Sequence, residues 1–397
     1  MRWGARKTPT WVLAALGLAA ASGCSGTGNP TRATPMTIGQ TPVQPSQATS
    51  TSAPARTDRF TVVATGDVLL PPALWNQARA DAENARTAMN FGPMLAGVKP
   101  YVAKADLAIC HLETPLAKPN GPFSGYPDFS GPPQIATALR ATGFDACSTA
   151  SNHTLDQGSA GISRTLRALD QARIKHTGSA RSETESRRIT LLRAGDVRVA
   201  LLSYAYGFNG HTYPGGRTWL ANRIDPVAIV DDAKRARRQG AQVVIAALHW
   251  GTEYQQTPSR QQLDLAPRLA RSGALDLIIS HHSHVVEPVQ RIGRVWVVYG
   301  LGNLIAFHST PGLPNQEGLL ASFTFTRSGT RWTVTTAGYL PLLVTRRPPI
   351  RLLPVTAALR TGRYGSSTRA RLTQALERTT RVVMSMGAAE QGLVRLG

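Results

Sequence analysis

From about residue 59 the chain alternates between apolar runs and amphipathic segments. Five runs share one format, because each is rich in β-formers and ends in polar side chains: RFTVVATGDVLL, ADLAICHLE, GFDACSTASNH, AQVVIAALHW and ALDLIISHHSH. Their apolar character is nearly continuous, which is typical of strands buried on both faces. The pattern therefore predicts five strands of an α/β domain, which deliver their polar ends to one edge of the sheet.

Helical patterns lie between and after these strands. Apolar residues recur at spacings of three and four, with Gly near the stops, in PQIATALRATG, AGISRTLRALDQARI, PVAIVDDAKRARRQG and RQQLDLAPRLARSG. Residues 317–344 alternate as strands, which we assign to a second sheet. Residues 366–386 predict one amphipathic helix with Leu372, Ala375, Leu376 and Thr379 on one side. Because strand and helix alternate, functional residues are expected at the carboxyl ends of the strands, where ligands gather in such sheets.

Histidines gather at these strand ends. Six of the nine in the chain stand there: His111, His153, His249, His281, His282 and His284. A single histidine at a strand end is usually a hydrogen-bonded core residue, but six make coincidence the poorer explanation. Residues two apart in an extended strand project to one side, so we expect His282 and His284 to face one site and His281 to point away.

Six polar residues at the strand ends are expected to converge in one cleft as metal ligands: Asp67, Glu113, Asn152, His249, His282 and His284. This mixture suits divalent ions of the Mn, Fe, Co, Ni or Zn class, and the absence of a paired Cys motif argues against structural zinc. His153, with Asp156 as its orienting partner, is the candidate acid or stabiliser of developing charge. The alternative for SNHTLDQG is a capped turn that starts a helix.

The N-terminus carries an export signal. Three basic residues precede the short apolar stretch WVLAALGLAAASG, which is too short for a stable membrane span. The stretch that ends at Cys24 resembles a bacterial lipobox, so we expect residues 1–23 to be a signal peptide and Cys24 to be lipidated. The alternative is an ordinary cleavage site with an incidental Cys. Residues 24–57, rich in Ser, Thr and Pro, predict an extended tether that holds the domain off the membrane.

Composition adds two points. The 397 residues carry a formal charge of +21, which suits an anionic partner, although Arg-rich and Ala-rich composition is also typical of GC-rich coding. No basic run is interleaved with aromatic residues, so nucleic-acid binding is not predicted. In the exported part, a disulfide between Cys110 and Cys147 and a pair of buried free thiols are both open.

Six motifs, in order, resemble the CapA family of poly-γ-glutamate capsule synthesis proteins, which is similar to the calcineurin-like metallophosphoesterases: TGDVLL, LAICHLETPL, GFDACSTASNHTLDQG, LHWGTEY, SHHSHVVEPV and VYGLGNLI. The resemblance implies a metallo-dependent phosphatase-like αββα sandwich, with two mixed sheets between helices and a dinuclear metal centre at one edge. It implies this domain over residues 58–345, followed by an extension over 346–397 with one packed helix. The six expected ligands fall at metal positions and His153 at the catalytic position; the rim would comprise Trp250, Glu253, Tyr254 and Asn303.

The sequence departs from the family pattern at the first metal. Calcineurin-like enzymes open with Asp-x-His, but Leu69 stands where that His is expected. One ligand is therefore missing, which predicts a lower affinity for the first ion. By the period of two, His111 faces the same side as Glu113 and is a candidate replacement. A Gln that is frequent in the family is Glu287 here.

Three functions remain open on the sequence. The first is a metal-dependent hydrolase of a phosphoester or anionic envelope polymer, anchored on the outer face of the bacterial membrane. The second is a non-catalytic accessory factor of capsule or polyglutamate synthesis and export that holds a polyanion, and the third is a binding lipoprotein with a structural metal. Dinuclear centres keep open positions, which favours catalysis. The missing ligand favours the second function.

Overall fold

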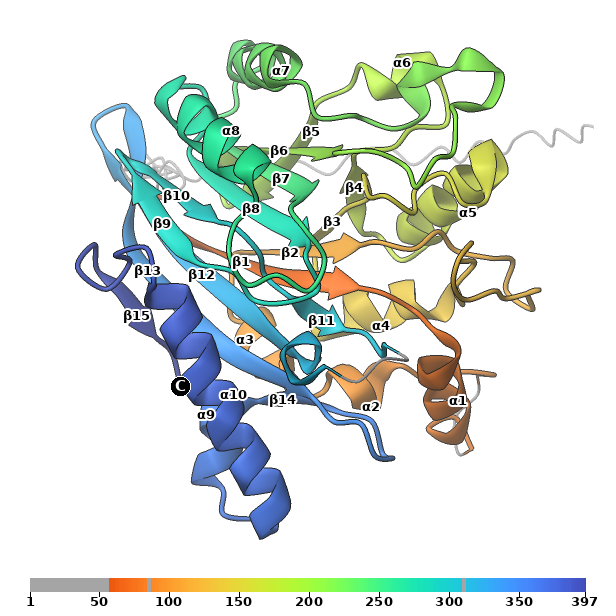
Figure 1. The fold of residues 1–397 in the computed structure, drawn as a ribbon. Helices are drawn as coiled ribbons and strands as arrows, with labels where there is room; N and C mark the ends of the chain where they lie inside the picture. Colours follow the sequence, from red (N-terminus) through yellow and green to blue (C-terminus); the bar gives the residue numbers. More distant parts are fainter. Residues whose placement is uncertain (1–56, 84–86, 309–311) are drawn as a thin grey trace, which may run out of the picture. The chain divides into compact units, whose positions relative to one another are not determined.

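The computed structural model describes residues 57–83, 87–308 and 312–397. The predicted signal peptide, Cys24 and all but the last residue of the tether lie outside the described residues. Within the described ranges, no helix combines the length and apolar character needed to cross a membrane. Two sheets pack face to face between layers of helices (Figure 1), so the chain has the four-layer αββα architecture.

The larger sheet has the strand order β14-β13-β12-β1-β2-β3-β4, with β11 beside β1 and β15 beside β13. Strands β1 to β4 are parallel, whereas β13 runs antiparallel to both β12 and β14, and β12 runs antiparallel to β1; β15 is parallel to β13. The bounds are β1 Arg59–Val68, β2 Leu107–Leu112, β3 Ala146–Ser148, β4 Lys175–Thr177, β11 Asn303–Ile305, β12 Glu317–Ser328, β13 Arg331–Val344, β14 Leu352–Pro354 and β15 Leu393–Arg395.

The smaller sheet has the order β5-β6-β7-β8-β10-β9. Its four inner strands are parallel, and the two edge strands are antiparallel to their neighbours. The bounds are β5 Thr190–Ala194, β6 Val197–Ala205, β7 Val243–Trp250, β8 Leu277–His282, β9 Val289–Ile292 and β10 Val295–Val298.

Helices cover the outer faces of both sheets. Those named α1 to α5 pack on the larger sheet, and α7 and α8 pack on the smaller one. Their ends follow local chemistry, because the Asp225 side chain caps the start of α7 and Ser259 forms a capping box with Gln262 at α8. The bounds are α1 Pro72–Ala80, α2 Gly92–Leu95, α3 Lys99–Val102, α4 Gln134–Thr142, α5 Gly158–Gln171, α6 Glu183–Ser186, α7 Pro226–Arg238, α8 Arg260–Arg271, α9 Val355–Arg360 and α10 Ser366–Met384.

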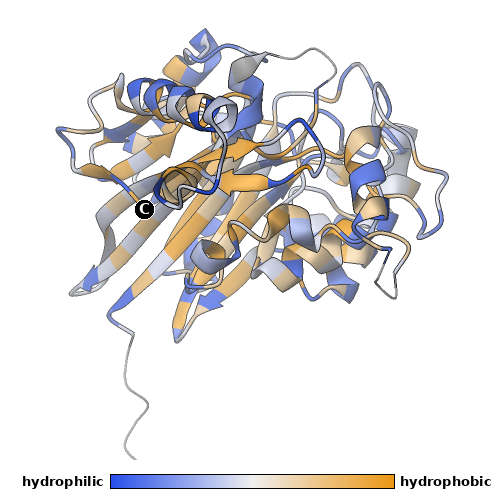
Figure 2. Ribbon diagram, turned by 90° about the horizontal axis from the view of Figure 1, so that it is seen from below, coloured by the Kyte–Doolittle hydropathy of each residue, from blue (hydrophilic) through white to orange (hydrophobic). Residues whose placement is uncertain are grey.

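The strands are buried on both faces, as their continuous apolar character predicts. In β1, Val62 and Ala64 face the smaller sheet, while Val63 between them faces the helices. Figure 2 shows the hydrophobic strands in the interior and hydrophilic residues on the surrounding helices and loops. A strand that must satisfy two cores cannot alternate with polar residues, so polar groups are confined to its ends.

Two expectations about the sheets were wrong. The strands of residues 317–344, β12 and β13, belong to the same sheet as β1, because β12 pairs antiparallel with β1. The five strands expected at one sheet edge are divided, with β1, β2 and β3 in the larger sheet and β7 and β8 in the smaller one. An alternating pattern identifies a strand, but it does not identify the neighbour with which the strand pairs.

The C-terminal segment contributes more than the one expected helix. Helix α10 lies where the pattern predicts it and buries Leu372, Ala375 and Thr379. The segment also supplies α9 and the strands β14 and β15, both of which pair with β13. The buried Glu317 carboxylate joins α10 to the larger sheet through ion pairs of 2.6 Å with Arg371 and Arg378.

Candidate metal centre

The six expected ligands lie together where the two sheets meet. Asp67 at the end of β1, Glu113 just after β2 and Asn152 after β3 come from the larger sheet; His249, His282 and His284 come from the smaller one. The ring centroids of His249 and His282 are 4.8 Å apart, and those of His282 and His284 are 6.3 Å apart. All six side chains are buried.

A close backbone approach places Asp67. A Cβ at Gly66 would collide with the carbonyl oxygen of Gly302, so only glycine fits at this point. The next residue, Asp67, donates its backbone N–H to the same carbonyl over 2.9 Å. The end of β1 is thereby fixed against the loop that precedes β11.

The ligand atoms form three overlapping groups, the third of which is Asp67, His111 and His249. Asp67, Glu113 and His284 offer atoms within 4.8 Å of one another, and so do Glu113, His249 and His282. Asn152 joins the second group, because its Oδ1 lies 2.9 Å from Nε2 of His249. Glu113 belongs to both of these groups, which is the position of a bridging carboxylate, and Asp67 is likewise shared between the first and the third group.

Several polar atoms in this region have no hydrogen-bond partner among the described residues. They include both carboxylate oxygens of Glu113, Oδ1 of Asp67 and Nδ1 of His282, and all of them are buried. A buried polar atom left unsatisfied costs about 1–3 kcal/mol, so native proteins rarely gather several at one point without a partner. Divalent cations satisfy carboxylate and imidazole atoms, and the residues present therefore fit a divalent metal site.

The two carboxylates of the first group, Asp67 and Glu113, also favour a positively charged neighbour. His284 lies with Nδ1 3.3 Å from Asp67 and Nε2 3.6 Å from Glu113. Burial alone would lower the pKa of His284, but the two carboxylates raise it to about 10. Burial opposes ionisation of Asp67, yet the hydrogen bond and charge of His284 lower its pKa to about 2.

The second group is electrostatically different. Burial, reinforced by neighbouring histidines, lowers the pKa of His249 well below its usual value. Burial and the charge of His284 lower the pKa of His282 to about 3. Both rings are therefore neutral at physiological pH, which is the state in which imidazole binds a metal.

The His-Ser-His segment does not continue the strand. Strand β8 ends at His282, and both His282 (φ 98°) and His284 (φ 54°) have left-handed backbone conformations. The rings therefore meet through a turn, and the prediction that His282 and His284 alternate along an extended strand was wrong. His281 does not point away from the centre, since its ring stacks on His111 at 4.1 Å. Non-glycine residues with positive φ are uncommon and cluster at functional sites.

His153 stands beside the ligand groups without belonging to any of them. Its Nδ1 lies 2.8 Å from Oδ2 of Asp156, which also accepts the backbone N–H of Phe129 over 2.8 Å. The Phe129 ring packs edge-on against the imidazole at 4.7 Å. The capped-turn alternative for SNHTLDQG was wrong, because α5 starts after Gln157 and no side chain caps it.

The four expected rim residues take different places. Tyr254 is 53% exposed, with its ring 6.0 Å from that of His284, and Glu253 is also exposed. Trp250 does not line the rim: it is buried with α7 and α8, because it alternates with His249 along β7. Asn303 is buried as well, and its Oδ1 lies 3.1 Å from Nδ1 of His284, which it orients.

Three residues near the centre were missed. Tyr206 lies 4.6 Å from the His282 ring, and Asn209 accepts a 3.2 Å hydrogen bond from the Asn152 amide. Both follow β6, whose sequence VRVALLSYAYGFNG has the same apolar-to-polar format as the five strands recognised. His308 lies 4.7 Å from His284, measured between ring centroids. Its surroundings in the sequence carry no such signal.

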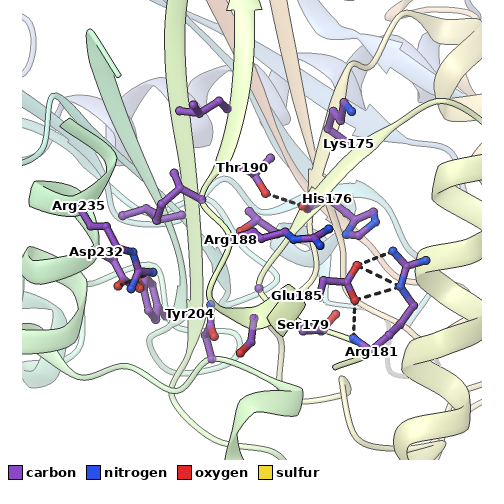
Figure 3. Close-up of a pocket in the computed structure, with 18 of the residues that line it drawn as sticks. Lys175, His176, Ser179, Arg181, Glu185, Arg188, Thr190, Tyr204, Asp232 and Arg235 are labelled. Atoms are coloured by element: carbon purple, nitrogen blue, oxygen red, sulfur yellow. Dashed lines mark hydrogen bonds and ion pairs between the residues drawn. The ribbon is translucent and has the colours of Figure 1, made fainter. Parts of the chain in front are cut away.

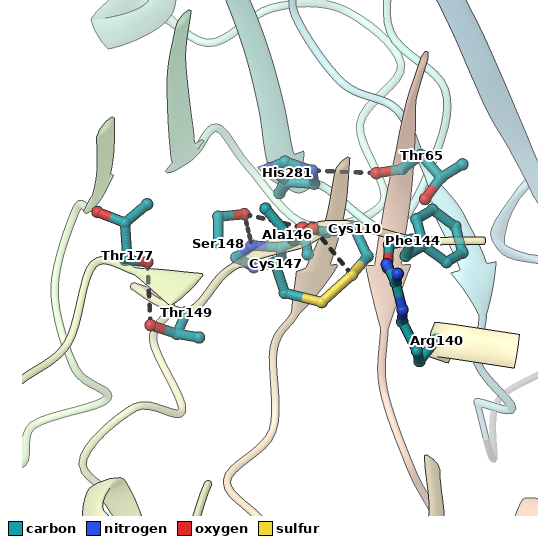
Figure 4. Close-up of a disulfide and its surroundings, with 11 residues drawn as sticks. Thr65, Cys110, Arg140, Phe144, Ala146, Cys147, Ser148, Thr149, Thr177 and His281 are labelled. Carbon is teal, nitrogen blue, oxygen red and sulfur yellow. Dashed lines mark hydrogen bonds between the residues drawn. A yellow bond between two sulfur atoms is a disulfide. The ribbon is translucent and has the colours of Figure 1, made fainter. Parts of the chain in front are cut away.

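Cys110 and Cys147 form a disulfide, which resolves the alternative left open by the sequence. The two residues are direct neighbours in register on β2 and β3. Figure 4 shows the bond close to Ser148, the residue that follows Cys147. The cross-link therefore joins the strand that leads to Glu113 to the strand that leads to Asn152.

Comparison with known proteins adds a family. Residues 61–308 match the family described as bacterial capsule synthesis protein PGA_cap. Capsule biosynthesis protein CapA of Bacillus anthracis is 26% identical over 215 residues, which are 52% of each chain. A probable polyglutamine synthesis accessory protein of Mycobacterium tuberculosis is 26% identical over 247 residues, 58% of this chain and 59% of the relative. The chain thus spans about half the length of the curated relatives it matches.

Among solved structures, the calcineurin-like phosphoesterase YfkN of Bacillus subtilis aligns with 80% of this chain and 98% of its own, at 15% identity and a TM-score of 0.45.

Proposed function

Because the chain belongs to the bacterial capsule synthesis protein PGA_cap family, which its residues 61–308 match, we propose that it is a metal-dependent hydrolase of a phosphoester or an anionic envelope polymer. The environment of Glu113 is the main support for this proposal. Both of its oxygens are buried without a hydrogen-bond partner in the described part of the chain, and it is shared by the first and second ligand groups. A bridging carboxylate between two ions is the arrangement of two-metal hydrolytic sites.

The two groups would hold the ions unequally. Glu113, Asn152, His249 and His282 offer four ligands to the second ion, whereas Asp67, Glu113 and His284 offer three to the first. Leu69 stands where the family pattern has the His of Asp-x-His. It packs with Phe129 and Ala306 in a small apolar cluster and supplies no ligand atom. We propose Mn, Fe or Zn class ions, the first bound more weakly than the second. Bound there, they would supply Lewis acidity and activated water.

His153 supplies the proton chemistry in this proposal. Asp156 holds Nδ1 as the hydrogen-bonded atom, which leaves Nε2 to exchange a proton with the substrate. Phe129 limits rotation of the ring from one side. An oriented imidazole of this kind protonates a leaving group as the bond to it breaks.

The N-terminal sequence and the family support a location at the cell envelope. We propose that the protein is exported and anchored on the outer face of the cell membrane through a lipid on Cys24. Its partners would be an anionic polymer or phosphoester and the machinery of capsule or polyglutamate synthesis. The relatives named for capsule and polyglutamine synthesis support an envelope role.

Metal analysis and turnover together test the proposal. The purified protein is loaded with Mn or Zn and assayed on phosphodiester and γ-glutamyl substrates. His153→Ala is expected to retain its metal and to lose about 10²–10⁴ in rate, the usual contribution of a positioned acid or base. His282→Ala is expected to lose metal and activity together, because it removes a direct ligand. Glu390→Gln, at an exposed position outside the ligand groups, is the control.

The outcomes separate the candidate functions. Loss of metal in His153→Ala would make His153 a ligand and remove the proposed proton donor. The absence of turnover in the fully loaded wild type on both substrate classes would favour the accessory factor that binds a polyanion. The missing ligand at Leu69 is the observation that keeps this second function under test.

A further inference from the structure

A pocket separate from the proposed metal ligands lies at the edge where β4 of the larger sheet approaches β5 and β6 of the smaller one. Its volume is about 390 Å³, and its walls come from β4, the α6 segment, β5, β6 and α7. Pockets for small ligands span about 300–1,000 Å³, so this one suits a short segment of a chain. None of the six expected metal ligands lines it.

Charged side chains of both signs line the pocket (Figure 3). Arg181 forms ion pairs with Asp170 and Glu185, and Arg235 forms one with Asp232. Tyr204 donates its hydroxyl to Asp232 over 2.7 Å. These contacts give each of the three carboxylates an arginine partner, although Arg181 is shared by Asp170 and Glu185.

Two cations of the lining have no such compensation. The side chains of Arg188 and Lys175 form no ion pair or hydrogen bond with the described residues. In Figure 3, Arg188 lies between the Arg181–Glu185 pair and the Tyr204–Asp232 pair. A third donor is incompletely used, because Nε of Arg235 is buried and has no partner in the described ranges.

The composition of the lining selects the ligand. Unpaired guanidinium and ammonium groups attract carboxylates, and arginine can bind one with two parallel hydrogen bonds. The neighbouring carboxylates of Asp170, Glu185 and Asp232 can also accept hydrogen bonds from amide N–H groups, which a peptide offers and inorganic phosphate lacks. A ligand that alternates carboxylates with amides satisfies both kinds of wall.

We propose that this pocket binds a short segment of an acidic peptide, with its carboxylates on Arg188 and Lys175. The choice of a γ-linked glutamyl chain as the preferred peptide rests on the proposed function, whereas the peptide class rests on the pocket. The pocket would hold the polymer at a distance from the metal centre, so that a chain is retained independently of any reaction there.

Calorimetric titration of the full-length protein with γ-linked tetraglutamate tests the proposal, before and after metal removal with a chelator. Arg188→Gln combined with Lys175→Gln is expected to weaken binding about tenfold or more, since one lost charge-assisted contact is worth at least about 1.4 kcal/mol. Arg187→Gln combined with Arg193→Gln is the matched control, because it also removes two positive charges at exposed positions and neither residue lines the pocket. It should leave binding unchanged, and thermal melting checks that each variant is folded.

Each alternative result is decisive. Equal weakening in the control variant would mean that net charge alone attracts the peptide. It would overturn the assignment of this pocket as the peptide site. If inorganic phosphate binds as tightly as the peptide, the proposed preference for a peptide is overturned. If peptide binding requires metal, the peptide binds at the metal centre and the proposed pocket is overturned. Equal binding of α-linked tetraglutamate would keep the pocket and remove the γ-linkage. Failure of hydrolysis would overturn the proposed function alone, because peptide binding is measured without turnover.

Discussion

His249 Nδ1 lies 2.9 Å from Nε2 of His111, and Nδ1 of His111 lies 2.8 Å from the hydroxyl of Ser148. Because Nε2 of His249 is the atom that faces Asn152, an ion bound there requires the proton of His249 on Nδ1. That proton is donated to His111, which in turn donates to Ser148. In this arrangement His111 would orient His249; because Asp67, His111 and His249 also offer atoms within 4.8 Å of one another, the direct ligand suggested by the sequence is the alternative to be tested.

His111→Phe tests this assignment. The substitution removes both hydrogen bonds and leaves His249 free to rotate, so we expect about 10–100-fold weaker binding of one ion, the usual effect of losing an orienting partner. His249→Ala should abolish that site altogether. Metal content after dialysis against graded free Mn measures both variants. Should His111→Phe lose its ion as completely as His249→Ala, His111 would be a direct ligand.

Glu287 predicts a pH dependence of stability. It is buried, and Gln262 donates to it over 3.0 Å; burial raises its pKa to about 8 despite this bond. Between the ordinary value of about 4.5 and about 8, the unfolded chain has released this proton and the folded chain retains it. The contribution of Glu287 to the free energy of unfolding therefore falls by about 1.4 kcal/mol per pH unit as pH rises across this window.

Glu287→Gln removes this slope, since Gln fits the same space without a charge. We expect the variant to match the wild type near pH 5 and to melt at a higher temperature at pH 8. Glu390→Gln, at an exposed position, is the control. Identical pH profiles of melting for Glu287→Gln and the wild type would show that Glu287 is not the group responsible.

The Cys110–Cys147 disulfide predicts a dependence on redox conditions. The bond closes a loop with a sequence separation of 37, and a loop of this length stabilises the folded state by up to about 4 kcal/mol. A reductant should lower the melting temperature of the wild type and have no effect on Cys110→Ala/Cys147→Ala. Thiol titration of the unfolded, unreduced protein checks the premise: free thiols at both positions would mean that the bond is absent.

Cys24 predicts attachment to the membrane. Cys24→Ser is expected to release the protein into the medium or to leave an uncleaved precursor, because a serine cannot receive the lipid. Fractionation of cells that express either form, with detection of the folded domain, measures this. Unchanged recovery of the variant in the membrane fraction would count against the anchor.

The sequence predicted the centre better than the sheets around it. Buried strands exclude polar residues except at their ends, so Asp67, Glu113 and His249 were visible as exceptions to apolar runs. Strand partners depend on contacts far apart in the chain, such as that of β12 with β1, and no local pattern encodes them. His308 escaped detection for the same reason, since only its position in space relates it to His284.

Local conformation also limited the prediction. The left-handed backbone of His282 and His284 does not follow from residue types that disfavour it, and an extended geometry was therefore the default. Trp250 was placed on the rim because of its family motif, although its position next to His249 in a strand already required it to face the other way. Periodicity was the better guide at this position.

Trp296 of the smaller sheet packs on Phe323 of the larger one, with ring centroids 6.4 Å apart, in the core between the two sheets. Each half of the proposed ligand set is carried by a different sheet, so this apolar layer determines the separation of the two halves. An ion bound by both halves would link the two sheets. Its binding free energy would therefore be coupled to the packing of one sheet on the other. Metal affinity would then report on the integrity of an apolar interface that contributes no ligand.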